Sequence, residues 1–246
     1  MLTKTEGIVL KTHKYGEADL IVTFLTPSKG IISTFAKSPR KTKSRFGSSL
    51  EPLTYSRISL WGKEQSMLKV TQSDIIDSFH SLRENYQDFI NISKLAEILI
   101  SLTPSDIPSR KAFPFFLDAL KFLKSPSEKP KDMLHLIIQI RLLVMAGYAP
   151  KLNNCGRCGD KGQVFFPHAG SVLCNKCAPN LTKEPPIRIS GKTSIFYTHC
   201  IEWPVNTLGR LKPQQEILSE LSELIDRHIT YLLSKRLMTS KFLESA

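Results

Sequence analysis

The sequence predicts an α+β protein with more than one domain: a small β-barrel followed by a helical domain that carries a cysteine-rich insertion. Short runs of β-branched and aromatic residues fill roughly the first eighty positions. From about residue 80, apolar residues recur at intervals of three and four, and two Cys-x-x-Cys pairs interrupt that helical pattern. The 246 residues leave room for this division, since a single domain typically has about 100–150.

The N-terminal part reads as five short strands separated by turn formers. We expect strands near residues 7–10, 20–25, 30–35, 56–61 and 67–70. Turn-forming residues lie between them at 15–17, 27–30 and 61–64. Five strands in this length suit a small barrel, and both the OB fold and SH3-like barrels fit the pattern.

The rest of the chain reads as helices. The apolar spacing predicts helices near residues 86–102, 113–123 and 133–144, and Pro-containing breaks at 104–106, 125–127 and 147–150 mark their ends. A last helix is expected to start near Pro213 and to carry an apolar face through Leu232. We therefore expect one domain over residues 1–79 and a helical domain over 80–246, interrupted at about 151–182 by the cysteine segment.

The excess of positive charge lies in two segments. The chain has a formal net charge of +12 and a pI near 9.5. Residues 1–80 carry twelve Lys or Arg against seven Asp or Glu, and residues 151–200 carry seven against two. Such an uneven surplus favours a polyanionic partner, nucleic acid before an anionic membrane, although a generally basic soluble protein stays an alternative.

No segment resembles a signal peptide or a membrane span. The longest apolar region, around residues 134–146, is interrupted by Gln139 and Arg141, and the residues after Met1 lack a long apolar stretch. The sequence therefore predicts a cytoplasmic protein with no membrane partner.

The four cysteines Cys155, Cys158, Cys174 and Cys177 have the spacing of a four-thiolate zinc site. Each pair can form a tight turn that directs two sulfurs to one ion, and Gly156, Gly159 and Asn175 tolerate such turns. Four thiolates fill tetrahedral coordination, so the zinc is expected to be structural. An iron–sulfur cluster, a dithiol redox pair or disulfides remain less favoured interpretations.

Two further residues near the cysteines invite other interpretations. His168 lies between the pairs and can replace a cysteine as a ligand, but a surface position is favoured because four thiolates are present. Cys200 lies beside His199, which suggests a Cys–His nucleophile, but a lone buried cysteine is favoured over that hypothesis.

A basic loop follows the third expected strand. Between Asp19 and Glu51 the sequence has no carboxylate, and the segment AKSPRKTKSRF supplies the candidate DNA contacts Lys37, Arg40, Lys41, Lys43 and Arg45. Five aromatic residues nearby offer stacking platforms: Tyr15, Phe35, Phe46, Tyr55 and Trp61. A solvated loop above core aromatics is the alternative interpretation.

The sequence contains no convincing catalytic motif. SGKTS at residues 190–194 resembles the end of a phosphate-binding loop, but that motif needs a glycine where this chain has Pro186. A zinc deaminase needs a His-x-Glu or Cys-x-Glu before its Cys-x-x-Cys, and none is present. We therefore expect a binding protein without catalytic residues.

Two stretches of this chain resemble the bacterial RecO family of recombination mediators and DNA repair proteins. The opening resembles the family in its Gly-Ile-Val-Leu, in Tyr15-Gly16-Glu17-Ala18-Asp19 and in the basic stretch after Ala36-Lys37; IRLLVMAGYAPKLNNCGRCG resembles the helix that enters the first zinc knuckle. The tail RHITYLLSKRLMTSKFL is a looser match. Ser38 stands where the family usually has glycine, and Gln139 where it frequently has glutamate.

The resemblance implies an N-terminal OB fold, a helical domain and a four-cysteine zinc finger. It also implies a non-enzymatic role in the RecF pathway: binding single- and double-stranded DNA, annealing complementary strands and, with the partner RecR, helping to load RecA onto strands coated with single-strand-binding protein. By the same resemblance, the helical domain receives the C-terminal tail of that protein, and the basic-loop residues contact DNA.

Two other functions compete with this interpretation. An RNA-associated or translation-associated protein can combine an OB barrel with a zinc ribbon, and comparing affinities for single-stranded DNA and structured RNA separates it. A zinc-dependent nuclease is the enzyme alternative, and a cleavage assay with labelled DNA separates that one.

Overall fold

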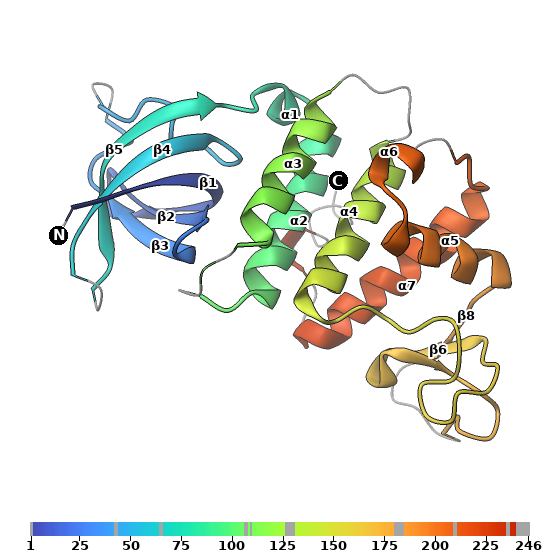
Figure 1. The fold of residues 1–246 in the computed structure, drawn as a ribbon. Helices are drawn as coiled ribbons and strands as arrows, with labels where there is room; N and C mark the ends of the chain where they lie inside the picture. The colour runs from blue at the N-terminus through green and yellow to red at the C-terminus, as the bar shows by residue number, and fades with distance from the viewer. Residues whose placement is uncertain are drawn as a thin grey trace. The chain divides into compact units, whose positions relative to one another are not determined.

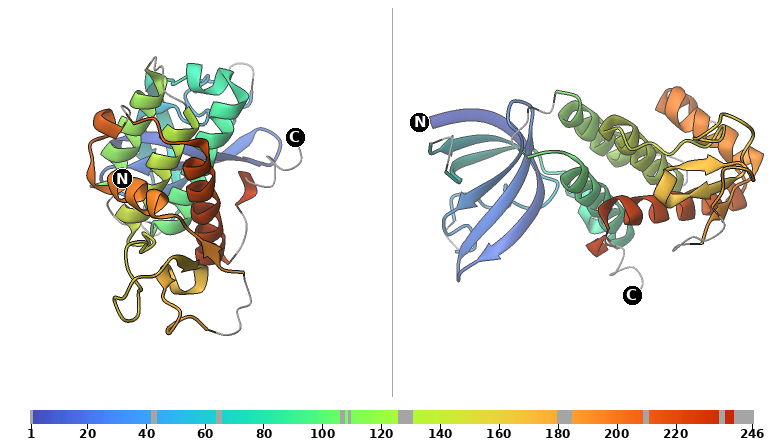
Figure 2. Two further views of the ribbon diagram at one scale, coloured as in Figure 1. Left: turned by 90° about the vertical axis from the view of Figure 1, so that its right-hand side faces the viewer. Right: turned by 90° about the horizontal axis from the view of Figure 1, so that it is seen from below.

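The computed structural model describes residues 2–41, 44–63, 66–105, 108, 110–125, 131–179, 185–208, 211–234 and 237–239. Its contacts divide the chain into two compact units, residues 1–127 and 128–246. The first unit contains the barrel and three helices, and the second contains the other helices and the cysteine segment (Figures 1 and 2). The expected division into 1–79 and 80–246 stays a prediction.

The barrel is closed and has the strand order β1-β2-β3-β5-β4, with β1 also paired to β4. Its strands are β1 (Leu2–Tyr15), β2 (Asp19–Thr26), β3 (Gly30–Ala36), β4 (Tyr55–Trp61) and β5 (Leu68–Asp77). Strands β3 and β5 are parallel and the other pairs are antiparallel. The prediction of an OB-fold barrel is confirmed, and β1 and β5 are longer than the sequence indicated (Figure 1).

The first strand closes the barrel because it pairs along both edges. Its N-terminal half pairs with β4 and its C-terminal half with β2, and the register shifts between Val9 and Lys11. Such a bulge bends a strand and increases its twist, which lets one long strand serve two neighbours. This strand therefore joins the two halves of the sheet.

Alternation along the strands separates the barrel core from its outer surface. Phe24, Ile58 and Leu60 are fully buried in the core. Burying one such side chain contributes about 1.5–3 kcal/mol. In the second half of β3 the exposed Ser33 and the half-buried Phe35 alternate with buried residues, so these two side chains lie on the outer surface.

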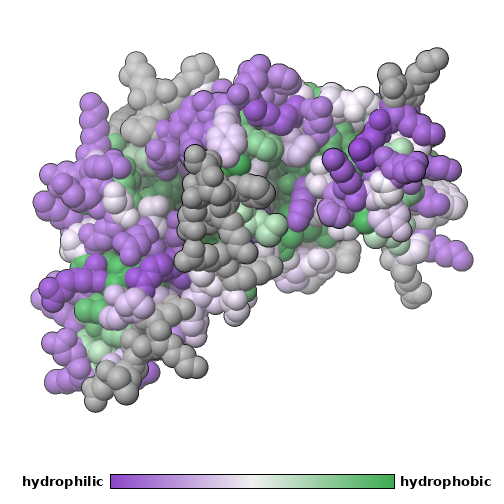
Figure 3. All heavy atoms as spheres, turned by 180° about the vertical axis from the view of Figure 1, so that it is seen from behind, coloured by the Kyte–Doolittle hydropathy of each residue, from purple (hydrophilic) through white to green (hydrophobic). Residues whose placement is uncertain are grey.

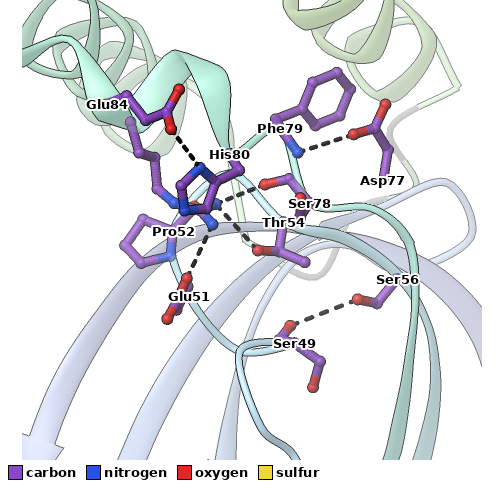
Figure 4. A network of polar contacts seen from close by, with 11 residues as sticks. Ser49, Glu51, Pro52, Thr54, Ser56, Asp77, Ser78, Phe79, His80 and Glu84 are labelled. Carbon is purple, nitrogen blue, oxygen red and sulfur yellow. Dashed lines mark hydrogen bonds and ion pairs between the residues drawn. The ribbon is translucent and has the colours of Figure 1, made fainter.

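Arg83 ties the short helix α1 (Ser81–Glu84) to the barrel. Its Nη1 donates to the carbonyl oxygens of Pro52 at 2.8 Å and Ser78 at 2.6 Å and to Thr54 Oγ1 at 3.3 Å, and its Nη2 lies 2.9 Å from Glu51 Oε2. Figure 4 shows Pro52 and Thr54, which precede β4, lying near Ser78, which follows β5. The guanidinium satisfies several partly buried acceptors at once, so its removal leaves them unpaired.

A second contact joins α3 (Ala112–Lys124) to the end of β5. Lys124 Nζ lies 2.8 Å from Asp77 Oδ2 and 5.4 Å from the centre of the Phe79 ring. Partial burial raises the pKa of Asp77, but hydrogen bonds from Lys124 and from the Phe79 N–H outweigh it and lower that pKa. Helix α2 (Tyr86–Leu102) begins at the Asn85 cap and completes the unit.

The second unit contains α4 (Lys131–Ala146), α5 (Gly191–Glu202), α6 (Val205–Leu208) and α7 (Gln215–Leu233). A small sheet in the order β7-β6-β8 consists of β6 (Val164–Phe166) and β7 (Ser171–Leu173) from the cysteine segment and β8 (Ile187–Arg188) just after it. The short 3-10 helix η1 (Pro167–Ala169) connects β6 to β7. Helix α7 begins two residues after Pro213, close to its expected start. No helix in the described part of the chain combines the length and apolar character that a membrane crossing needs.

Candidate metal centre and nucleic-acid interface

Two tight turns hold the four cysteines together. In the first, the Cys155 N–H donates to Asp160 O at 2.7 Å and the Gly159 N–H to Cys155 O at 2.9 Å. In the second, the N–H groups of Cys177 and Ala178 donate to Cys174 O at 3.0 and 2.9 Å. These bonds fold each Cys-x-x-Cys into a knuckle whose two sulfurs are directed to a common point.

The four sulfurs fit a tetrahedral metal site. The ligand atoms of Cys155, Cys158, Cys174 and Cys177 all lie within 4.8 Å of one another, and Cys158 Sγ is 3.6 Å from Cys174 Sγ. Four thiolates at about 2.3 Å from one ion are about 3.8 Å apart. The four sulfurs are therefore close enough together to hold one metal ion.

The thiols of Cys155 and Cys158 differ in pKa because their surroundings differ. Backbone N–H groups of Cys158 and Cys174 lower the pKa of Cys155 to about 6. For Cys158 the Asp160 N–H lowers the pKa, but the neighbouring thiols outweigh it and raise the pKa to about 12. Without an ion the cluster thus holds few negative charges, and metal binding must release protons from the remaining thiols.

Two glycines of the finger, which comprises residues 151–179 and 185–189 of the described chain, are needed for different reasons. A Cβ on Gly156 would lie 2.2 Å from Ser171 Oγ, so this position needs glycine for close approach. Gly159 has a φ of +82°, so it supplies the left-handed turn expected of it. The reason expected for Gly156, a permissive turn, is therefore replaced by contact with β7.

The neighbouring histidine and the fifth cysteine are not ligands. His168 is exposed, and its ring lies against Phe166 rather than in the sulfur cluster. Cys200 is fully buried, and burial raises the pKa of its thiol to about 12. His199 stacks on Trp203 with ring centres 3.9 Å apart. The interpretations of His168 as a surface residue and Cys200 as a core residue are confirmed.

The described part of the basic loop folds back on the β1–β2 turn. The Ser38 N–H donates to Asp19 Oδ1 at 2.7 Å, Arg40 Nη1 donates to Glu17 O at 2.8 Å and the Arg40 N–H to Ala18 O at 3.3 Å. Ser38 has a φ of +55°, which explains why glycine suits this position. The turn and the end of β3 thus form one surface.

Four charged side chains of this loop are exposed. Lys37, Arg40, Lys41 and Arg45 are exposed, and the Arg45 guanidinium lies 4.9 Å from the centre of the Phe46 ring. Lys43, the fifth expected DNA contact, lies outside the described residues. The motif Tyr15–Asp19 was recognised in the sequence, but nothing in it indicated that the Asp19 carboxylate accepts a hydrogen bond from the basic loop.

The five candidate stacking aromatics divide into two groups. Phe46 is 3% exposed and belongs to the barrel core. The Tyr55 hydroxyl donates to Glu6 and its ring meets Phe113, while burial and Glu6 raise the pKa of Tyr55 to about 12. These two rings are structural, whereas Tyr15, Phe35 and Trp61 lie on the outer surface of the barrel.

Fold and site define the class of protein: an OB-fold barrel joined to helices that carry a four-cysteine finger able to hold a metal. A family model for "Recombination protein O N terminal" matches residues 1–79, and one for "Recombination protein O C terminal" matches residues 83–241. Together these two models match most of the chain.

Whole-length relatives agree with the two family models. A DNA repair protein RecO of Thermodesulfovibrio yellowstonii is 41% identical over 233 residues, covering 93% of this chain and 92% of that protein. One of Dehalococcoides mccartyi strain 195 is 32% identical over 246 residues, covering 98% and 95%. The chain therefore belongs to the RecO family of DNA repair proteins.

Proposed function

We propose that this protein is a recombination mediator that acts on DNA without catalysing a reaction. It binds single- and double-stranded DNA, anneals complementary strands and, with RecR, helps to load RecA onto DNA coated with single-strand-binding protein. Membership of the RecO family supports the proposal, since the relatives are DNA repair proteins.

The observation that carries the proposal is the exposed basic loop on the OB barrel. Four described cations project from it, and the segment between Asp19 and Glu51 contains no carboxylate to offset them. OB folds bind oligonucleotides with one face of the barrel and the adjoining loops. Lys37, Arg40, Lys41, Lys43 and Arg45 are therefore the proposed phosphate contacts.

Counterion release gives such a surface its affinity and its tolerance of sequence. Each phosphate that a lysine or arginine neutralises frees condensed cations, so binding weakens as salt rises. Screening two strands on one protein lowers their mutual repulsion, which is the physical basis proposed for annealing.

The metal proposed for the four-cysteine site is Zn²⁺ in a structural role. Cys155, Cys158, Cys174 and Cys177 would complete its coordination and leave no open position for a substrate or water. The ion supplies folding free energy to a segment with little core of its own.

We further propose that the helical unit binds the tail of single-strand-binding protein and that the protein works in the cytoplasm at the nucleoid.

The salt dependence of DNA binding tests the proposal. We expect the substitutions Arg40→Ala, Lys41→Ala and Lys43→Ala, made together, to flatten the slope of log K against log salt for single-stranded DNA by about 2, because three phosphate contacts each contribute about 0.7. Fluorescence anisotropy of a labelled oligonucleotide measures the slope.

A second triple variant removes the same charge elsewhere. Arg110, Lys111 and Lys121 are exposed residues of the first unit outside the basic loop. Replacing these three with alanine should leave the slope unchanged. Equal slopes for the loop variant and the parent would remove the basic loop from the binding surface.

A further inference from the structure

A row of directly paired residues crosses the outer surface of the barrel. Strand register places Ile21 beside Phe35, Phe35 beside Lys69, and Lys69 beside Trp61. Paired residues on adjacent strands point to the same side of a sheet. Val70, the residue after Lys69, is buried in the core, so the row itself faces outward.

Three aromatic rings lie on or beside this row. Tyr15 contacts Phe35 edge to face with ring centres 6.0 Å apart, and Lys69 Nζ lies 5.8 Å from the centre of the Trp61 ring. Tyr15 is 55% exposed and Trp61 is 53% exposed. Tyr15, Phe35 and Trp61, together with Ile21 and Lys69, form a strip on the outer surface. Large apolar side chains that are this exposed and lie together indicate a binding surface rather than core packing.

The strip is continuous with the basic loop. Lys37 follows Phe35 by two residues and is exposed, in keeping with the outward side of β3. Lys69 places a further cation between Phe35 and Trp61. The hydrogen bond from Ser38 to Asp19 holds the start of the loop beside the end of the strand that carries Tyr15. Flat rings flanked by cations match a polyanion with exposed planar groups.

We propose that Tyr15, Phe35 and Trp61 stack against unpaired bases and make the protein prefer single-stranded over duplex DNA. The inference rests on the DNA binding proposed above and names the part of the barrel that distinguishes the two forms. Bases in a duplex stack on one another, so their faces reach protein rings only in a single strand. Base stacking is stronger than an exposed lysine–ring contact, so a base can displace Lys69 from Trp61.

Tryptophan fluorescence tests whether bases reach the strip. The chain has two tryptophans, and Trp203→Phe leaves Trp61 as the single reporter. We expect (dT)20 to quench this fluorescence at saturation and a 20-base-pair duplex, at its own saturation, to leave it unchanged. Anisotropy of labelled (dT)20 and of labelled duplex establishes saturation independently of the tryptophan signal. Quenching by neither ligand at saturation would contradict the inference.

Alanine variants of the strip test its contribution to selectivity. Trp61→Ala and Tyr15→Ala should each weaken binding of (dT)20 by about 5- to 150-fold for one stacked base lost, while duplex affinity changes by less than about twofold. Tyr86→Ala is the matched control, since Tyr86 is an exposed aromatic of the first unit outside the strip. Circular dichroism confirms that each variant is folded.

The outcomes separate the two proposals. If the unmodified protein binds neither single-stranded nor duplex DNA, the proposed function itself is contradicted. If the unmodified protein binds both forms and the strip variants have the same ratio of single-strand to duplex affinity, DNA binding stands. The stacking role of the strip is then contradicted. Loss of RecR binding in those variants, with DNA affinities unchanged, would assign the strip to a protein partner and also overturn the inference.

Discussion

At the scale of single residues, Asp19 shows how one side chain organises the proposed interface. Its carboxylate accepts from the Ser38 N–H at 2.7 Å and so fixes the start of the basic loop, where Ser38 has a left-handed conformation. A hydrogen bond to a charged group contributes about 1.5–3 kcal/mol. The Asp of the Tyr-Gly-Glu-Ala-Asp motif is therefore a positioning residue for the cations.

Asp19→Ala should lower the free energy of unfolding by about 1.5–3 kcal/mol and weaken binding to single-stranded DNA. Asp19→Asn retains an oxygen that can accept from Ser38 but lacks the charge, so it should lose less than Asp19→Ala in both measurements. Urea unfolding and anisotropy provide the two readouts. If the asparagine variant loses as much as the alanine variant, the carboxylate acts through its charge and the positioning role is wrong.

His228 is a buried titratable residue of α7 that contacts the finger. Its Nε2 lies 2.8 Å from Tyr148 O, its ring meets Phe165 edge to face, and no described partner pairs with Nδ1. Burial lowers the pKa of His228, and the hydrogen bond to the Tyr148 carbonyl opposes this only in part. The folded protein therefore favours the neutral imidazole.

The sign of this shift predicts acid sensitivity. Below about pH 6.5 the unfolded chain takes up a proton that folded His228 resists, so the free energy of unfolding should fall by at most about 1.4 kcal/mol per pH unit until the folded pKa is reached. In His228→Gln, which retains a donor for Tyr148, the difference between pH 7.5 and 5.5 should shrink. Denaturant unfolding at both pH values checks this, and an equal difference in both proteins would contradict it.

Residue positions could be predicted where they depend on spacing alone. The four cysteines were identified from their intervals, whereas the division of the five aromatics into core and surface depended on strand register and on contacts with distant residues such as Glu6 and Phe113. Gln139 is a further example: it donates to Asp226 of α7 at 3.2 Å, so a glutamate there would place two carboxylates together. A single sequence does not reveal such a partner.

At the scale of elements, the finger depends on its cysteines for its fold. Its buried cluster is small and includes two of the cysteines, with Phe166 and Leu173. Removing one ligand should therefore unfold the finger rather than merely weaken a binding site.

Cys174→Ser should lose bound zinc, expose the finger to proteolysis and reduce solubility. Cys200→Ser is the control, because Cys200 is buried away from the cluster and should keep one zinc per chain, although its polar substitute costs some stability. Metal analysis of both purified proteins gives the result. Full zinc content in the Cys174 variant would show that the cluster is not the site.

The helices show which elements local sequence predicts. Residues 86–102 were expected as a helix and form α2, because a long apolar period specifies both type and extent. Helix α5 was missed, since SGKTS was considered only as a failed phosphate loop. In the structure Ser190 Oγ accepts from the Thr193 N–H at 3.1 Å, so this segment is the N-terminal cap of a helix.

At the scale of the whole molecule, the two regions of positive charge lie in different compact units. The barrel region has its basic loop, and the finger region includes the exposed residues Lys151, Arg157 and Lys176. On the face drawn in Figure 3, hydrophilic side chains cover much of the outer surface of the barrel and of the finger. The barrel strands and the long helices α2, α3, α4 and α7 could be predicted from periodicity. The contacts of Arg83 with Pro52 and of Lys124 with Asp77 could not, because they join residues distant in sequence.

Affinity for a single-stranded 30-mer at two salt concentrations tests the central claim, that the barrel holds DNA through its cations. With about five phosphate contacts, binding should be strong at about 50 mM salt and about 100-fold weaker at about 200 mM. No binding at the lower salt concentration, or equal affinity at both concentrations, would contradict the account.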